Sequence, residues 1–175
     1  MIRMAIHMFV ALPAVLVLSA AGCGGSTAVR RGRDEGAALV AARLQTSGHR
    51  FGTDGSTRAL WGYLSVSHRV VPAANARPGD VLFFATRAGG GSPSCAAADH
   101  AGLVEAVTGD GRITFVEARA GRIRTSVVDP THPTVRRDAR GRIANSFLRA
   151  KTVGDAPGTR YFAGEMLCGV ARPGP

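Results

Sequence analysis

The sequence has few charged residues, and it lacks the residue spacings of several site classes. Only 19% of its 175 residues are charged while 45% are hydrophobic, which excludes a disordered chain and is typical of a globular protein. No group of His, Cys, Asp and Glu has the spacing of a metal site, so we expect neither a metal nor a cofactor. There is no internal repeat, and the length suits one domain, or one domain with a targeting segment.

Acidic residues are scarce relative to basic ones. Lys and Arg total 22 against 12 for Asp and Glu, a formal net charge of +10 that favours anionic partners. An Arg-rich composition without any anionic partner is the alternative. The cluster Arg136, Arg137, Arg140 and Arg142 has no interleaved aromatic residues and no nucleic-acid motif, so we expect no nucleic-acid partner. A solvated loop is the main interpretation of this cluster, with an anionic glycan or lipid headgroup as the alternative.

The first residues of the chain have the pattern of an export signal. A start with one cation, Arg3, is followed by the nearly continuous apolar segment 5–21 and by small residues before Cys23. This order is typical of a cleaved export signal. The apolar segment is shorter than the roughly 20 residues that a spanning helix needs, and Pro13 interrupts it. We therefore expect an exported chain rather than one with a transmembrane helix here.

Residues 18–23 (Leu-Ser-Ala-Ala-Gly-Cys) resemble a bacterial lipobox, with Ala20 where Leu is usual. The resemblance implies cleavage before Cys23 and a diacylglycerol on its thiol, and Gly24 implies the outer membrane if the host has one. We expect a signal peptide at 1–22, a flexible small and basic tether at 23–33, and one domain at 34–172, facing the periplasm or the cell surface. The alternative is an ordinary secretory signal that leaves Cys23 as a free thiol.

Two cysteines remain besides Cys23. An exported protein resides where disulfides persist, and an even pair fits one bridge, so we expect a Cys95–Cys168 disulfide. Two separate free thiols are the alternative.

The hydrophobic pattern changes from helical to strand-like along the chain. A helix is predicted from the acidic pair at Asp34 to just before Gly48, and a second one from Asp54 or Gly55 through Leu64. Turns are predicted at 77–80 and 108–111, and a polar excursion at 129–160 with a short helix at 143–149. Helices followed by an antiparallel meander predict an α+β domain. The strands are predicted at 81–85, 101–107, 113–118, 122–128 and 161–170.

Segments 77–84 (Arg-Pro-Gly-Asp-Val-Leu-Phe-Phe) and 99–105 (Asp-His-Ala-Gly-Leu-Val-Glu), followed by the strand 113–118, resemble the second half of a CHAP/NlpC-type papain-like cell-wall hydrolase domain. With the N-terminal helices, the likeness covers most of residues 34–128. The resemblance implies a papain-like α+β fold in which His100 is the catalytic base and Glu117 orients its imidazole.

The same family places its nucleophilic cysteine at a helix N-terminus, in an Asp-Cys-Ser-Gly motif. There a helix dipole and a neighbouring imidazolium favour the thiolate. The matching residues here are Asp54, Gly55, Ser56 and Thr57, so Gly55 occupies the nucleophile position and has no side chain to attack an amide. Asp54 and Ser56 are the residues that we expect to bind substrate.

Three interpretations follow. The main one is an envelope protein with a degenerate peptidoglycan amidohydrolase or endopeptidase domain that binds cell-wall peptide or a protein partner without cutting. The second is an active amidohydrolase that uses Cys95 or Ser56 as its nucleophile. The third is a structural or adhesion lipoprotein in which His100 and Glu117 have no site role.

Overall fold

The computed structural model describes residues 27–46, 56–67, 69–86 and 92–174. Its elements, in chain order, are α1 (Thr27–Thr46), α2 (Thr57–Ser67), β1 (Arg69–Val71), η1 (Ala73–Asn75), β2 (Val81–Phe84), η2 (Cys95–Ala97), β3 (His100–Val107), β4 (Ile113–Arg119), β5 (Arg122–Val128), α3 (Ala163–Met166) and β6 (Leu167–Arg172). The predicted signal peptide and Cys23 lie outside the described residues.

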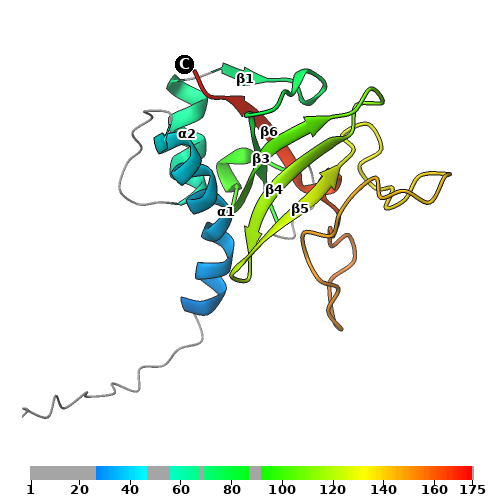
Figure 1. Ribbon diagram of the computed structural model, residues 1–175. Helices are drawn as coiled ribbons and strands as arrows, with labels where there is room; N and C mark the ends of the chain where they lie inside the picture. The colour runs from blue at the N-terminus through cyan, green and yellow to red at the C-terminus, as the bar shows by residue number, and fades with distance from the viewer. Residues whose placement is uncertain (1–26, 47–55, 68, 87–91, 175) are drawn as a thin grey trace, which may run out of the picture.

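The strands form one six-stranded sheet in the order β1-β6-β2-β3-β4-β5, and every neighbouring pair is antiparallel. β2 to β5 follow one another as a meander, while β6 returns from the end of the chain and pairs between β1 and β2. α1 and α2 lie together against one face of the sheet (Figure 1). This arrangement confirms the predicted α+β class.

β2 is buried on both of its faces, as its continuous apolar sequence predicted. Val81 and Phe83 pack with the helices, whereas Leu82 and Phe84 pack into a second cluster with residues of β4 and α3. Because side chains alternate along a strand, a strand between two apolar clusters needs apolar residues at every position. The sheet is thus the middle layer of the domain.

Two predicted turns are present, one just before β2 and one between β3 and β4. At residues 77–80, Gly79 has a φ of 90°, which favours glycine, and the Asp80 N–H donates to the Arg77 carbonyl at 3.0 Å. The Asp80 carboxylate then accepts from both Arg172 nitrogens that face it, each at 2.9 Å, which ties the turn to β6. The predicted turn at 108–111 is also present, closed by a bond from the Gly111 N–H to the Thr108 carbonyl.

The structure corrects several local predictions. α1 begins at Thr27 rather than near Asp34, so the helix extends into the segment predicted as a tether. The short helix predicted at 143–149 is wrong, since residues 129–160, all of them described, contain no helix. There the Asn145 side chain bonds to four backbone groups, the N–H groups of Asp129 and Gly164 and the carbonyls of His132 and Val135. A segment held by such tertiary hydrogen bonds does not need the helical ones.

The strand predicted at 161–170 is partly wrong. Its first half contains the helical turn α3, and β6 begins only at Leu167. The cause is Glu165, whose Oε2 accepts from the backbone N–H groups of Tyr161 and Phe162, each at 2.9 Å. This contact satisfies donors at the start of the turn, as in a capping box.

Candidate functional site

His100 and Glu117 form a buried pair at the centre of the sheet. His100 opens β3, Glu117 lies on the neighbouring β4, and the His100 Nε2 atom is 2.6 Å from the Glu117 Oε2 atom. Their side chains are only 5% and 0% exposed. The structure therefore brings together the two residues predicted to be base and orienter, in a place that solvent hardly reaches.

The strand register explains why these two residues meet. Gly102 lies opposite Glu117 in the antiparallel pairing of β3 with β4, which places His100 close to Glu117. A Cβ at Gly102 would lie 2.5 Å from a ring carbon of Phe115, so only glycine lets β4 pack here. The His-x-Gly pattern in the sequence thus has a packing reason as well as a family resemblance.

Ser126 and Arg119 complete the cluster, and the sequence analysis did not single out Ser126. The Ser126 hydroxyl, buried on β5, donates to Glu117 Oε1 at 2.5 Å. An Arg119 nitrogen lies 3.9 Å from the same oxygen. The sequence offers no clear signal for Ser126, because the residues of β5 before it are exposed on both faces and burial begins only at Ser126.

The electrostatics of the cluster favour an ionised Glu117. Burial alone would raise the pKa of this carboxyl, but hydrogen bonds from His100 and Ser126 and the nearby charge of Arg119 outweigh it, so the pKa is lowered from its usual value. A carboxylate only accepts hydrogen bonds, so His100 Nε2 carries the proton. In a neutral imidazole this leaves Nδ1 as the acceptor, the tautomer that a general base needs.

The helix that faces His100 is α1, and it approaches through a glycine. A Cβ built on Gly36 would lie 3.1 Å from the His100 Cε1 atom and 2.3 Å from the Ala101 carbonyl oxygen. Gly36 is buried and lies inside α1 rather than at its first turn. No side chain therefore fits at this point of the helix without a shift, and the dipole of the helix N-terminus does not act here.

The predicted nucleophile position, Gly55, and the neighbouring Asp54 lie outside the described residues. Ser56 is described: its hydroxyl oxygen accepts from the Ala59 N–H at 3.1 Å, so it caps α2. α2 packs on β1, β6 and η2, whereas α1 packs on β3 and β4, the strands that carry His100 and Glu117.

Cys95 and Cys168 are joined by a disulfide, with their Cα atoms 5.2 Å apart. The bond links η2 to β6 across 73 residues of sequence. A sulfur in a disulfide is not a thiolate, so Cys95 offers no nucleophile in this state.

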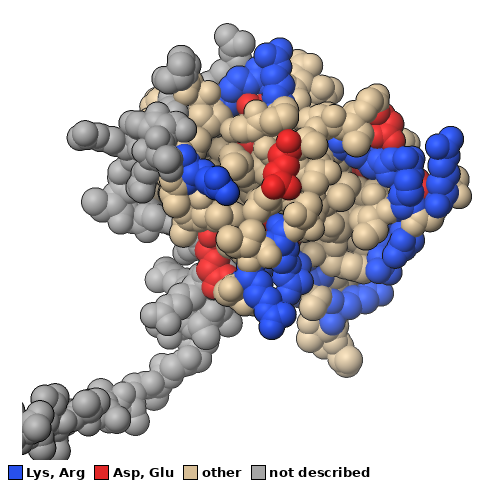
Figure 2. Space-filling model, in the orientation of Figure 1, with Lys and Arg blue, Asp and Glu red and all other residues tan. Residues whose placement is uncertain are grey.

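The Arg-rich segment is held by local contacts. Arg142 pairs with Asp138 at 2.7 Å, Arg137 donates to the Gly141 carbonyl, and the Arg136 guanidinium lies 4.7 Å from the centre of the Phe147 ring. Figure 2 shows acidic side chains among the basic ones where Figure 1 draws the segment after β5. These pairs reduce the charge that the segment presents to a partner.

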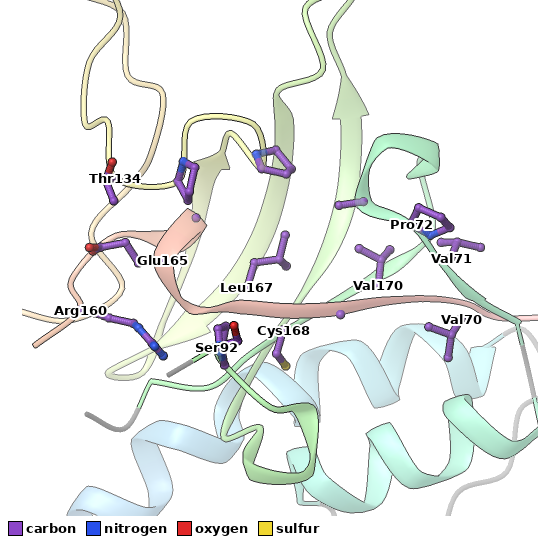
Figure 3. Close-up of a pocket in the computed structure, with 16 residues that line it drawn as sticks. Val70, Val71, Pro72, Ser92, Thr134, Arg160, Glu165, Leu167, Cys168 and Val170 are labelled. Carbon is purple, nitrogen blue, oxygen red and sulfur yellow. The ribbon is translucent and has the colours of Figure 1, made fainter. Parts of the chain in front are cut away.

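A large pocket lies elsewhere, along β6 (Figure 3). It has a volume of about 980 Å³, and neither His100 nor Glu117 is among the residues that line it. Its walls come from β6, from the chain at 70–73, from the prolines that follow β5, and from Arg160 and Glu165. The segment after Asp129 therefore borders this pocket.

Within the described part of the chain, no group of three or more His, Cys, Asp or Glu side chains is placed to hold a metal ion. None of the helices in that part is both long enough and apolar enough to cross a membrane. No family model, curated protein or solved structure matches the chain.

Proposed function

We propose that the chain is an exported, lipid-anchored envelope protein with a degenerate papain-like domain, which binds cell-wall peptide without cutting it. The observation that carries the proposal is the His100–Glu117 pair, which has the hydrogen bond of an oriented catalytic base but, among the described residues, faces Gly36 instead of a thiol. In the family register that we propose, the nucleophile position is Gly55, which has no side chain, and a base without a nucleophile supports no acyl transfer.

Three features support the papain-like part of the proposal. The Pro-Gly-Asp turn leads into the central strand β2, the histidine opens the adjacent β3, and the orienting carboxylate lies on β4. A helix packs across β3 and β4 over the histidine. The order of the turn, the histidine and the carboxylate is the one that the family resemblance implies. The helix over the histidine differs from it, because this helix is α1 and not α2, whose start at residues 54–57 matches the motif of the nucleophile.

The test is a titration of the purified full-length chain with soluble peptidoglycan peptides, followed by mass spectrometry of the peptides. We expect saturable binding, peptides of unchanged mass, and weaker binding by His100→Ala and Glu117→Gln. His132→Ala is the matched control, because His132 is 66% exposed on a loop. Circular dichroism checks that each variant is folded. Unchanged affinity in both folded site variants would overturn the proposal.

A second candidate function is a structural or adhesion module without a retained site. The burial of His100 and Glu117 favours it, since side chains that are 5% and 0% exposed contribute more readily to fold stability than to ligand contact. It predicts no binding of peptidoglycan peptides in the same titration.

A further inference from the structure

β6 is paired with β1 along only half of its outer edge. Arg172, Ala171 and Val170 lie opposite the three residues of β1, but the pairing ends at Val71. On its other side, β6 pairs with β2 down to Leu167. Residues 167–169 therefore form a stretch of strand with one edge unpaired among the described residues.

The two edges of the sheet differ in how they are protected. At the far edge, β5 carries the exposed side chains of Arg122 and Arg124, and the Val127 backbone is bonded to Ser146 in both directions. Exposed charges and a covering loop are the usual means of preventing strand addition. The open stretch of β6 reads Leu-Cys-Gly, carries no charged side chain of its own, and has no strand partner on this edge among the described residues.

The pocket described above lies along this stretch. Leu167, Cys168 and Gly169 line it, together with Val71, Pro130 and Pro133. Its volume of about 980 Å³ is at the upper end of the roughly 300–1,000 Å³ range of ligand sites. Leu167 and Val170 lie on one side of the β6 ribbon and Cys168 on the other (Figure 3). An added strand would thus place alternate side chains against an apolar wall.

One cation in the lining of the pocket has no ion-pair partner among the described residues. Arg160 lines it and extends toward Ser92 in Figure 3, and no ion pair within the described residues involves its guanidinium. Glu165, the one acid in the lining, has its Oε2 occupied by the Tyr161 and Phe162 N–H groups. Arg160 is therefore the charged group in the lining that can pair with a carboxylate of a ligand.

We propose that the β6 edge binds an extended acidic segment of a partner protein by strand addition, with a carboxylate of the partner on Arg160. Backbone hydrogen bonds would supply affinity, and the apolar wall and Arg160 would supply specificity. A second copy of this chain is a poorer occupant, because a two-fold axis at this edge would bring Arg160 near its own copy. The proposal uses no residue of the His100 cluster, so it stands or falls separately from the proposed function.

The test uses the oxidised full-length chain and fluorescein-labelled octapeptides of alternating valine and glutamate. Matched peptides carry lysine in place of glutamate, or N-methyl groups on alternate amides. We expect the acidic peptide to bind by fluorescence anisotropy, and the N-methylated and lysine peptides to bind at least about tenfold more weakly. Amide NMR shifts should centre on residues 167–169.

Arg160→Glu should weaken the acidic peptide by about tenfold or more, while Arg122→Glu, on the protected edge, should leave its affinity unchanged. Equal binding of the N-methylated peptide would overturn strand addition. Equal binding of the lysine peptide would overturn the acidic partner. Concentration-dependent shifts at residues 167–169 without peptide would identify a second copy as the occupant and overturn the proposal.

Discussion

The contact between α1 and the strand of His100 predicts that Gly36 tolerates no side chain. The perturbation is Gly36→Ala, the smallest possible addition. The new Cβ would lie 2.3 Å from the Ala101 carbonyl oxygen, a backbone atom of a paired strand, and 3.1 Å from His100 Cε1. Neither obstacle is the free end of a flexible side chain, because Glu117 holds the imidazole at 2.6 Å. The helix therefore has to move away from the sheet.

The magnitude follows from two opposing contributions. Overpacking of this kind costs about 1–3 kcal/mol, and alanine recovers about 1 kcal/mol of helix propensity relative to glycine. Because the main obstacle is backbone, we expect the upper part of the overpacking range and a net loss of about 2 kcal/mol in the free energy of unfolding. Gly62→Ala is the control: a Cβ at Gly62 in α2 meets nothing within 4 Å. It should stabilise the chain by about 0.5–1 kcal/mol.

Urea denaturation followed by far-ultraviolet circular dichroism measures both variants against the wild type. The reasoning requires a lower midpoint for Gly36→Ala and a higher one for Gly62→Ala, with similar slopes. A Gly36→Ala variant as stable as wild type, with Gly62→Ala stabilised, would refute the close approach of α1 to His100.

Three further predictions concern the disulfide, the His100 cluster and the turn before β2. Reduction of the Cys95–Cys168 bond, which spans 73 residues, should remove about 4 kcal/mol of stability by the chain-entropy relation; equal urea midpoints with and without dithiothreitol would contradict this. The pKa of Glu117 is lowered from 4.5, so its contribution to stability is present above that pH and is lost as pH falls through the folded value. Glu117→Gln should therefore cost about 2 kcal/mol at pH 7 and flatten the acid side of the stability profile; parallel profiles would argue against an ionised Glu117. Asp80→Asn weakens the bidentate pair with Arg172, in which the aspartate side chain is only 3% exposed. We expect the free energy of unfolding to fall by about 2 kcal/mol. Thermal or urea unfolding measures this loss, and an unchanged midpoint would contradict it.

The local hydrophobic pattern was sufficient to predict the strands at the centre of the sheet. The strands β2 to β5 have continuous or alternating apolar residues, and turns with glycine join β3 to β4 and β4 to β5, so the predicted bounds agree with the structure to within a residue or so. β1 has only three residues, too few for a periodic pattern. The helix predicted at 143–149 is wrong because Asn145 bonds to residues distant in sequence, and no local pattern reveals such bonds.

The candidate site was predicted in part. His100 and Glu117 were paired through the family resemblance, and the strand register brings them within hydrogen-bond distance. Ser126 was missed because its burial depends on the whole sheet rather than on its neighbours in sequence. Gly36 was missed because a close approach between a helix and a strand leaves no periodic signal. The open edge of β6 likewise follows from the shortness of β1, which only the topology reveals.

The most direct measurement of the central claim is release of soluble muropeptides from purified peptidoglycan. The full-length wild type, His100→Ala and an active cell-wall endopeptidase as positive control would be incubated in parallel and the products separated by chromatography. The account predicts that the wild type releases no more than His100→Ala, because Gly55, at the nucleophile position of the proposed family, has no side chain for His100 to activate. Release by the wild type that His100→Ala abolishes would show a working catalytic site and contradict the account.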